Sequence, residues 1–132
     1  HVDLMIAPTV SIFNIWNICK FHHYLVDQKL MEPDGFNVNL LQAPPHYRID
    51  LLPMDIKLRL KQQLEQHIEW LRPLDPTQRS TVQFEGVVAF MMATDNTSLL
   101  PNFWKETAGL DRIRSEKLVD VVPELRALEQ YR

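Results

Sequence analysis

Two apolar runs with similar endings dominate the first third of the chain. One run covers residues 2 to 7 and the other covers residues 36 to 42, and an Ala-Pro pair closes each run. Between them, over residues 15 to 29, apolar side chains recur every three or four positions, which is typical of an amphipathic helix. Because parallel strands need a long crossover, this order predicts a β-α-β unit with buried strands.

The ends of the two predicted strands leave alternatives open. Pro8 cannot donate to a central ladder, which favours a first strand that ends near Ala7. In the alternative, the strand continues after a kink through residues 9 to 12. In the second strand Asn37 and Asn39 alternate with apolar residues. This pattern predicts polar groups facing the interior of a barrel or, alternatively, an edge strand with solvated asparagines.

The remainder of the chain predicts helices. A stripe of apolar residues indicates an amphipathic helix over residues 53 to 72; its members are Ile56, Leu60, Leu64, Ile68 and Leu71. Asp75 is placed to cap a helix that starts at Pro76 and is apolar nearly all round over residues 82 to 93. A strand over residues 82 to 92 is the alternative. Further helices are predicted over residues 99 to 108, where Gly109 ends or interrupts the helix, around residues 110 to 122, and from Pro123 onward. Two parts are therefore predicted, 1 to 72 and 73 to 132.

Composition narrows the classes of function. The chain has 132 residues, of which 45% are hydrophobic, and its net charge is −3. These values indicate one ordinary domain with a core and give no basic face for nucleic acid. No apolar run reaches the roughly 18 residues needed to span a bilayer, so a cytoplasmic protein without a membrane partner is predicted. Because the chain opens with His1 directly on strand-like residues, we expect it to be a fragment of a longer protein.

The residue types that carry chemistry are sparse. Cys19 is the only cysteine, and its helical context predicts a small buried apolar residue. His22 and His23 are adjacent and point about 100° apart on a helix, so the histidines predict no metal site. The three glycines form no phosphate-binding loop. The candidate acids are Asp3, Asp50 and Asp55, and their positions favour helix-start partners over catalysis. No catalytic residue and no metal ligand is assigned.

Three polar residues follow the first predicted strand, namely Thr9, Ser11 and Asn14. Asn14 is placed to cap the following helix by accepting a hydrogen bond from a backbone N–H of its first turn. A role in binding a ligand is equally open for this residue.

Two stretches resemble a known family. Val10-Ser11-Ile12-Phe13-Asn14 and the stretch from Val38 to Pro44 are similar to the segments around the fifth and sixth barrel strands of radical S-adenosylmethionine (SAM) proteins with a twitch-type domain, found in phages and marine bacteria. Residues 107 to 114 and 122 to 125 also resemble the tails of those proteins. The resemblance implies an α/β fold: the last two βα units of a partial (β/α)6 radical-SAM-type barrel, followed by a helical C-terminal extension.

The resemblance also implies that SAM is the cofactor and that this chain supplies only part of its binding site. Ser11 and Asn14 would hydrogen-bond the ribose of SAM, and Leu41 and Gln42 would contact its adenine. The three-cysteine loop that binds the 4Fe-4S cluster of the family is absent, so the missing N-terminal half of the same protein would supply it, and this part would be inactive alone. A peptide or small molecule would be the substrate. The alternative is a non-catalytic α/β interaction module whose exposed sheet edge binds a protein partner.

Overall fold

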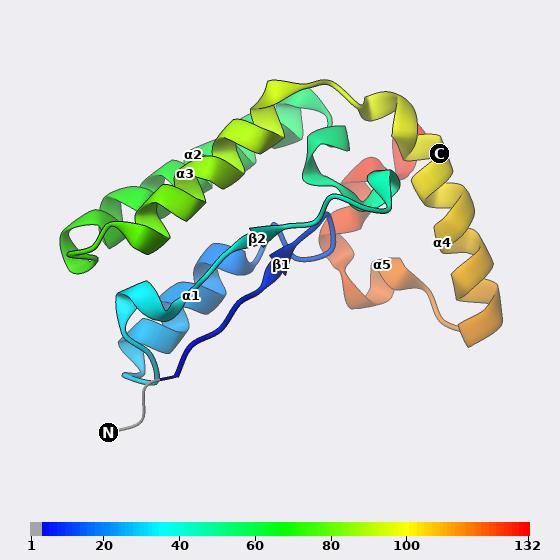
Figure 1. Ribbon diagram of the computed structural model, residues 1–132. Helices are drawn as coiled ribbons and strands as arrows, with labels where there is room; N and C mark the ends of the chain where they lie inside the picture. The colour runs from blue at the N-terminus through cyan, green and yellow to red at the C-terminus, as the bar shows by residue number, and fades with distance from the viewer. Residues whose placement is uncertain (1–3) are drawn as a thin grey trace.

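The computed structural model describes residues 4 to 132, which begin with a small β-α-β unit (Figure 1). Strand β1 (Thr9–Val10) and strand β2 (Asn39–Leu40) are parallel, and helix α1 (Ile18–Asp27) connects them. Thr9 lies beside Asn39 and Val10 lies beside Leu40. The β-α-β order that the sequence predicts is therefore present, with a helix shorter than predicted.

The backbone pairing extends beyond the two labelled strands. Ile6 forms a parallel bridge with Phe36, its N–H donates to the carbonyl of Gly35 at 2.9 Å, and its carbonyl accepts from Asn37 N–H at 2.8 Å. The chain thus stays extended from Ile6 through Val10, across Pro8. The alternative in which the strand continues after that proline through residue 12 is therefore confirmed for Thr9 and Val10 only, since Ser11 and Ile12 enter the turn that follows. Residues 1 to 3 of the predicted strand, with the candidate acid Asp3, lie outside the described residues.

The predicted fold class is wrong. The described chain is mostly helical and pairs only two short strands, so it is not the closing part of a (β/α)6 barrel. After β2 the prolines at 44, 45 and 53 remove the backbone donors that a further strand needs. Short 3₁₀ turns take the place of a ladder there, at Pro45–Tyr47 and Ile49–Leu51.

Helices α2 (Met54–Leu71) and α3 (Arg79–Ala93) lie side by side along the β-α-β unit (Figure 1). All five residues of the predicted apolar stripe of α2 are buried, which confirms that helix. The helical prediction for α3 is also confirmed over the strand alternative. However, α3 is not buried all round, because Val82 is 60% exposed and Glu85 and Ala89 are exposed as well.

Asp75 caps α3 from a position before the helix. Its Oδ2 accepts from the N–H of Thr81 at 2.9 Å and from the Thr81 hydroxyl at 3.0 Å, and its Oδ1 accepts from the hydroxyl of Thr77 at 3.2 Å. The predicted role is confirmed in part: Asp75 binds an N–H of the first turn, but the N-cap residue is Gln78, and the helix starts at Arg79 and not at Pro76. The backbone N–H groups of the first helical turn have no hydrogen-bond partner within the helix, and the carboxylate accepts from one of them.

Helix α4 (Leu100–Arg114), helix α5 (Leu118–Val121) and a long 3₁₀ segment (Pro123–Tyr131) complete the chain. The predicted helix end near Gly109 is wrong, since α4 continues for another turn. Trp104 joins α4 to the last segment by donating from Nε1 to the carbonyl of Leu128 at 2.9 Å. The remaining 3₁₀ turns are Pro33–Gly35, Arg72–Leu74 and Thr97–Leu99. Within residues 4 to 132, no helix has the length and apolar character required to cross a bilayer.

Residues from both sides of position 72 build one hydrophobic core. Phe36, Leu64, Phe84 and Phe103 are all at most 1% exposed and belong to the same cluster. The predicted division of the chain into 1 to 72 and 73 to 132 stays a prediction.

Gly35 gives a direct test of the close approach between β1 and β2. A Cβ at this position would lie 2.8 Å from the carbonyl oxygen of Leu4 and 2.9 Å from Cγ of Met31. Because the backbone oxygen cannot move aside, Gly35→Ala is expected to lower the free energy of unfolding by about 1 to 3 kcal/mol, measured by urea denaturation. Gly86→Ala is the control. Its Cβ meets nothing within 4 Å, and alanine is expected to stabilise α3 by about 1 kcal/mol. Equal effects of the two substitutions would contradict this packing.

Candidate functional site

The structure brings the four predicted SAM-contacting residues to one end of the strand pair. Leu41 N–H donates to the carbonyl of Val10 at 3.0 Å, which places Leu41 beside the start of the turn that contains Ser11 and Asn14. Gln42 follows directly and is exposed. The assignment of these residues to a nucleoside site stays a prediction.

The polar atoms of Ser11 and Asn14 are engaged within the turn between β1 and α1. Asn14 Oδ1 accepts from Ser11 N–H at 2.9 Å, and Asn14 Nδ2 donates to the carbonyl of Thr9 at 2.9 Å. The Ser11 hydroxyl, on a residue that is 5% exposed, accepts from Phe13 N–H at 3.2 Å. Asn14 is also not the cap of α1, which begins at Ile18. Both side chains therefore close the turn.

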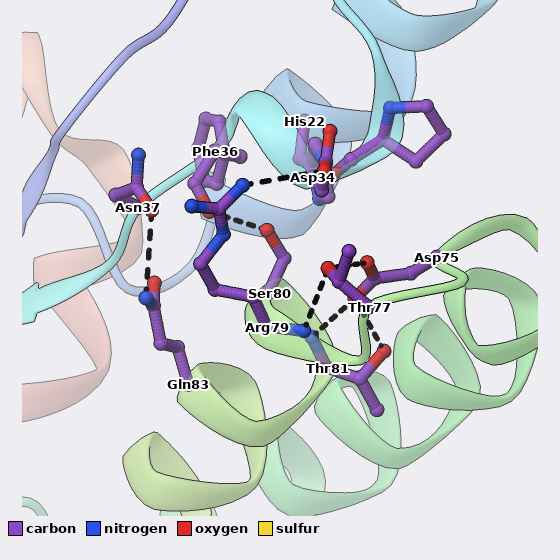
Figure 2. Close-up of polar contacts among 11 residues, drawn as sticks. His22, Asp34, Phe36, Asn37, Asp75, Thr77, Arg79, Ser80, Thr81 and Gln83 are labelled. Atoms are coloured by element: carbon purple, nitrogen blue, oxygen red, sulfur yellow. Dashed lines mark hydrogen bonds and ion pairs between the residues drawn. The ribbon is translucent and has the colours of Figure 1, made fainter.

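Side chains of α3 cover the outer edge of β2 (Figure 2). The hydroxyl of Ser80 donates to the carbonyl of Phe36 at 2.8 Å, and Gln83 Oε1 accepts from the N–H of Val38 at 2.6 Å. Gln83 Nε2 also lies 3.5 Å from Oδ1 of Asn37. These side chains bind one outward acceptor, the Phe36 carbonyl, and one outward donor, the Val38 N–H, in the extended residues that lead into β2. They therefore hinder the addition of a further strand beside residues 36 to 38.

Arg79 and Asp34 add an ion pair at the same junction, with Nη2 and Oδ2 3.3 Å apart (Figure 2). Both side chains are at least 31% exposed, so this pair contributes little to stability. The hydrogen bonds from Ser80 and Gln83 are thus the main polar link between α3 and the sheet.

The opposite edge of the sheet, along β1, is open. The backbone groups of Ile6, Pro8 and Val10 bond to β2, so those of Met5, Ala7 and Thr9 point away from it. In the described part of the chain, the N–H and carbonyl groups of Met5 and Ala7 have no hydrogen-bond partner, and neither has the N–H of Thr9. This edge therefore presents an unpaired row of donors and acceptors.

Exposed apolar side chains surround the open edge. Met5 is 58% exposed and Leu4 is 39% exposed. On α1, Phe21 and Tyr24 are 44% and 56% exposed, whereas His23, on the other side of the helix, stacks on Trp70 of α2 at 4.1 Å. Because α2 and α3 lie on the β2 side of the sheet, the side of α1 away from α2 lies beneath β1. Phe21 and Tyr24 therefore extend the apolar surface next to the open edge.

A buried histidine pair joins α1 to α2. His22 is fully buried and lies parallel to the rings of Phe36 and Phe84, with centroid distances of 4.4 and 5.4 Å. Its Nε2 is 2.9 Å from the carbonyl of Pro33, and its Nδ1 is 2.9 Å from Nε2 of His67. A carbonyl can only accept, so His22 carries its proton on Nε2, and His67 donates to His22 Nδ1. This chain of bonds fixes one tautomer for each ring when both are neutral.

Burial keeps both rings neutral. Loss of hydration lowers the pKa of His22 to about 4 and that of His67 to about 3, and the neighbouring His22 contributes to the lowering for His67. Neither histidine is thus a proton carrier near neutral pH. The pair serves the packing of α1 against α2.

A second buried polar network surrounds Asp50, one of the candidate acids. Asp50 is fully buried, and its Oδ2 accepts from Arg48 Nη2 at 2.6 Å, from Asn96 Nδ2 at 2.8 Å and from the Thr94 hydroxyl at 3.0 Å. Nearby, the buried Lys57 donates from Nζ to the carbonyl of Thr94 at 2.7 Å, and burial lowers the pKa of its ammonium group. The network holds the segment after β2 against the end of α3, so Asp50 has a structural role.

Sequence patterns contain partial signals for these features. His22 lies on the apolar face of the predicted helix, a position that indicates a buried histidine. Met5, Ala7 and Thr9 are alternate, uncharged positions of the first strand. Ser80 and Gln83 are polar positions at the start of an otherwise apolar helix. None of these patterns identifies the partner residue in space.

Among the described residues, no group of three or more histidine, cysteine or acidic side chains could hold a metal ion. Cys19 is half-buried, and burial raises the pKa of its thiol to about 12, so the thiol is protonated and a poor nucleophile. The open edge of β1 is the candidate functional site that remains. Comparison with family models, with curated proteins and with solved structures found no match to this chain, and the resemblance to radical SAM proteins stays a prediction.

Proposed function

We propose that this protein is an interaction module in which β1 binds an extended segment of a partner protein as an additional strand. The observation that carries the proposal is the difference between the two sheet edges. Side chains of α3 bind the Phe36 carbonyl and the Val38 N–H at one edge, whereas at the other edge five of the six outward backbone groups of Met5, Ala7 and Thr9 have no partner within residues 4 to 132. An interaction module with an exposed sheet edge is also the alternative that the sequence predicts.

The small size of the sheet supports strand addition. A two-stranded sheet is marginal by itself, and parallel sheets are usually covered on both faces. Here α1 covers the face that carries Val10, while Ala7 and Thr9 are exposed on the opposite face. An added strand would extend the ladder and bury part of the apolar surface at Met5.

The edge also lacks the features that usually prevent strand addition. Charged side chains and outward-facing prolines are the common protections, and residues 4 to 10 contain no charged side chain. Pro8 is present, but its carbonyl accepts from Asn39 N–H at 2.9 Å, so its missing donor faces β2. The outward row at Met5, Ala7 and Thr9 is complete despite the proline.

Strand addition predicts a defined chemistry of recognition. Backbone hydrogen bonds supply the affinity, and alternate side chains of the bound segment supply the selectivity. We expect the segment to be extended and uncharged where it faces Leu4 and Phe21, since both apolar side chains are partly exposed there. This chemistry requires no cofactor.

A peptide selection tests the proposal. Peptides of about ten residues, selected from a random display library on the full chain, are expected to shift the backbone amide NMR signals of Met5, Ala7 and Thr9. Ala7→Pro removes an outward N–H and is expected to weaken peptide binding at least about tenfold, the equivalent of one lost hydrogen bond of about 1.4 kcal/mol.

Ala7→Val is the matched control, because it changes the exposed side chain and keeps the N–H. It is expected to bind the same peptides within about twofold. A selection that yields no peptide sensitive to Ala7→Pro contradicts the proposal, provided that the circular dichroism spectrum of the variant matches that of the wild type.

A further inference from the structure

We propose that the segment bound at the open edge is β1 of a second copy of this chain, paired antiparallel about a two-fold axis at Ala7. This inference rests on the proposed function and names its partner. The result would be a four-stranded sheet in the order β2, β1, β1 of the second copy and β2 of the second copy.

The outward backbone groups of the open edge are spaced so that two copies of the edge can pair with each other. Met5, Ala7 and Thr9 have outward backbone groups at intervals of two residues, with Ala7 in the centre. In an antiparallel pair, Ala7 lies opposite Ala7 of the second copy, and Met5 lies opposite its Thr9. Opposed residues of this kind exchange both of their hydrogen bonds, which permits up to about six bonds across the junction. The Thr9 carbonyl already accepts from Asn14 Nδ2 at 2.9 Å, and its second lone pair is available.

The side chains at the junction fit this arrangement. Ala7, the residue on the axis, has the smallest side chain of the three, so two copies meet there without crowding. A surface that meets itself about a two-fold axis brings like charges together, which is costly. Residues 4 to 10 carry no charge, so no such cost arises along the strand.

The position of α1 supplies a second, independent argument. Each α1 lies behind its own strand pair (Figure 1), and in the four-stranded sheet the two pairs are offset by two strand spacings of about 4.8 Å. The two α1 helices would then lie about 10 Å apart, which is a normal distance for packed helices. Phe21 and Tyr24 of α1, with Gln28 directly after its last residue, form an exposed, uncharged stripe on the side that would face the second copy. Its spacing of three and four residues is that of a helix-packing face.

A second copy would cover more of the exposed surface near the open edge than an unrelated peptide would. A bound peptide pairs with β1 and leaves most of the Phe21 and Tyr24 rings exposed, whereas a second copy covers the strand edge and the α1 stripe at once. The two features are separate in the sequence and share the same side of the molecule.

Disulfide trapping and sedimentation test the inference on the full chain. In a Cys19→Ala background, Ala7→Cys is expected to form a disulfide-linked dimer under mild oxidation, because opposed residues of an antiparallel pair have Cα atoms about 5.5 Å apart, within disulfide range. Asn39→Cys is the control. It is exposed on β2 and pairs with Thr9, two residues from the axis, so it would lie about 20 Å from its equivalent in the second copy and is expected to remain monomeric. In sedimentation equilibrium, Ala7→Pro and Phe21→Ser are each expected to raise the dimer dissociation constant at least about tenfold.

The outcomes separate this inference from the proposed function. A chain that stays monomeric at all accessible concentrations, but binds selected peptides at Met5, Ala7 and Thr9, overturns the inference and leaves the proposed function in place. A dimer that is insensitive to Ala7→Pro and does not form the Ala7→Cys disulfide also overturns it, because the contact then lies on another surface. A dimer that both variants weaken, with trapping at residue 7 and not at residue 39, supports it.

Discussion

Asp50→Ala is expected to lower the free energy of unfolding by about 3 to 5 kcal/mol. The carboxylate is fully buried and accepts hydrogen bonds from Arg48, Thr94 and Asn96. Removal of one partner of a largely buried ion pair costs this much, because the Arg48 side chain is only 26% exposed, keeps most of its desolvation penalty and loses its compensation. Here the Arg48 guanidinium would be left against the ring of Phe90, 5.0 Å from its centroid. Urea denaturation of the full chain measures the change.

Two further variants separate charge from shape. Asp50→Asn keeps an oxygen that can accept from Thr94 and Asn96 and removes the charge, so its effect should be smaller than that of alanine. Asp55→Ala is the matched control, since the Asp55 side chain is 67% exposed and its partner Arg59 is 3.8 Å away on the surface. We expect a change below about 0.5 kcal/mol there. If Asp50→Ala were as mild as Asp55→Ala, the buried network would not hold the segment after β2.

Acidification is the second large effect, and it acts through the histidine pair. The pKa of both rings in the folded chain lies below 6.5, at about 4 for His22 and about 3 for His67, because burial disfavours the charged form. The unfolded chain therefore binds more protons than the folded chain once the pH falls below 6.5. The contribution of the neutral histidine pair to the free energy of unfolding is therefore fully present above that pH, and it is lost as the pH falls toward 4.

The free energy of unfolding that is lost on acidification is comparable to the total free energy of unfolding of a small domain. Each pKa unit corresponds to about 1.4 kcal/mol, so the shift of His22 alone gives a loss of roughly 3 kcal/mol between pH 6.5 and pH 4. His67 contributes a similar amount. Because small domains unfold at about 5 to 15 kcal/mol, we expect cooperative acid unfolding in this range.

The slope of stability against pH tests this prediction. Between about pH 5 and 6 the two histidines together should give a slope approaching 2.7 kcal/mol per pH unit, from urea denaturation at several pH values. His67→Gln retains an N–H donor for His22 Nδ1 and removes one titrating group, so the slope should fall by about half. His23→Gln is the control, because that side chain is 45% exposed. If His67→Gln left the slope unchanged, the prediction that both histidine rings are neutral in the folded chain would be contradicted.

Local patterns predict the helices of this protein well. The stripe from Ile56 to Leu71 is buried as expected, and Asp75 binds the first turn of α3 as expected, because both depend on residues close in sequence. The β-α-β order is also local, since the crossover contains its own helix. The local β-α-β pattern gives no information about the number of strands in the sheet. The barrel prediction fails for this reason.

The contacts that the sequence does not predict are those between distant residues. His22 meets His67, and Val38 meets Gln83, across 45 residues in each case. Polar residues at the end of a strand, such as Ser11 and Asn14, are equally compatible with a ligand and with a turn, and the structure engages them in a turn. The open edge of β1 likewise becomes recognisable only when Ser80 and Gln83 are seen on the edge of β2.

The cover that α3 places on β2 limits how far this sheet can grow. A sheet with two free sides propagates without end, copy upon copy, and produces fibres. In this sheet Ser80 and Gln83 hinder growth on the side of β2, because they bind the outward groups of Phe36 and Val38. The proposed pairing through β1 would consume the open side of each copy, and association would stop at a closed, finite particle. Loss of both terminating side chains, as in a Ser80→Ala and Gln83→Ala double variant, would reopen the route to polymerisation.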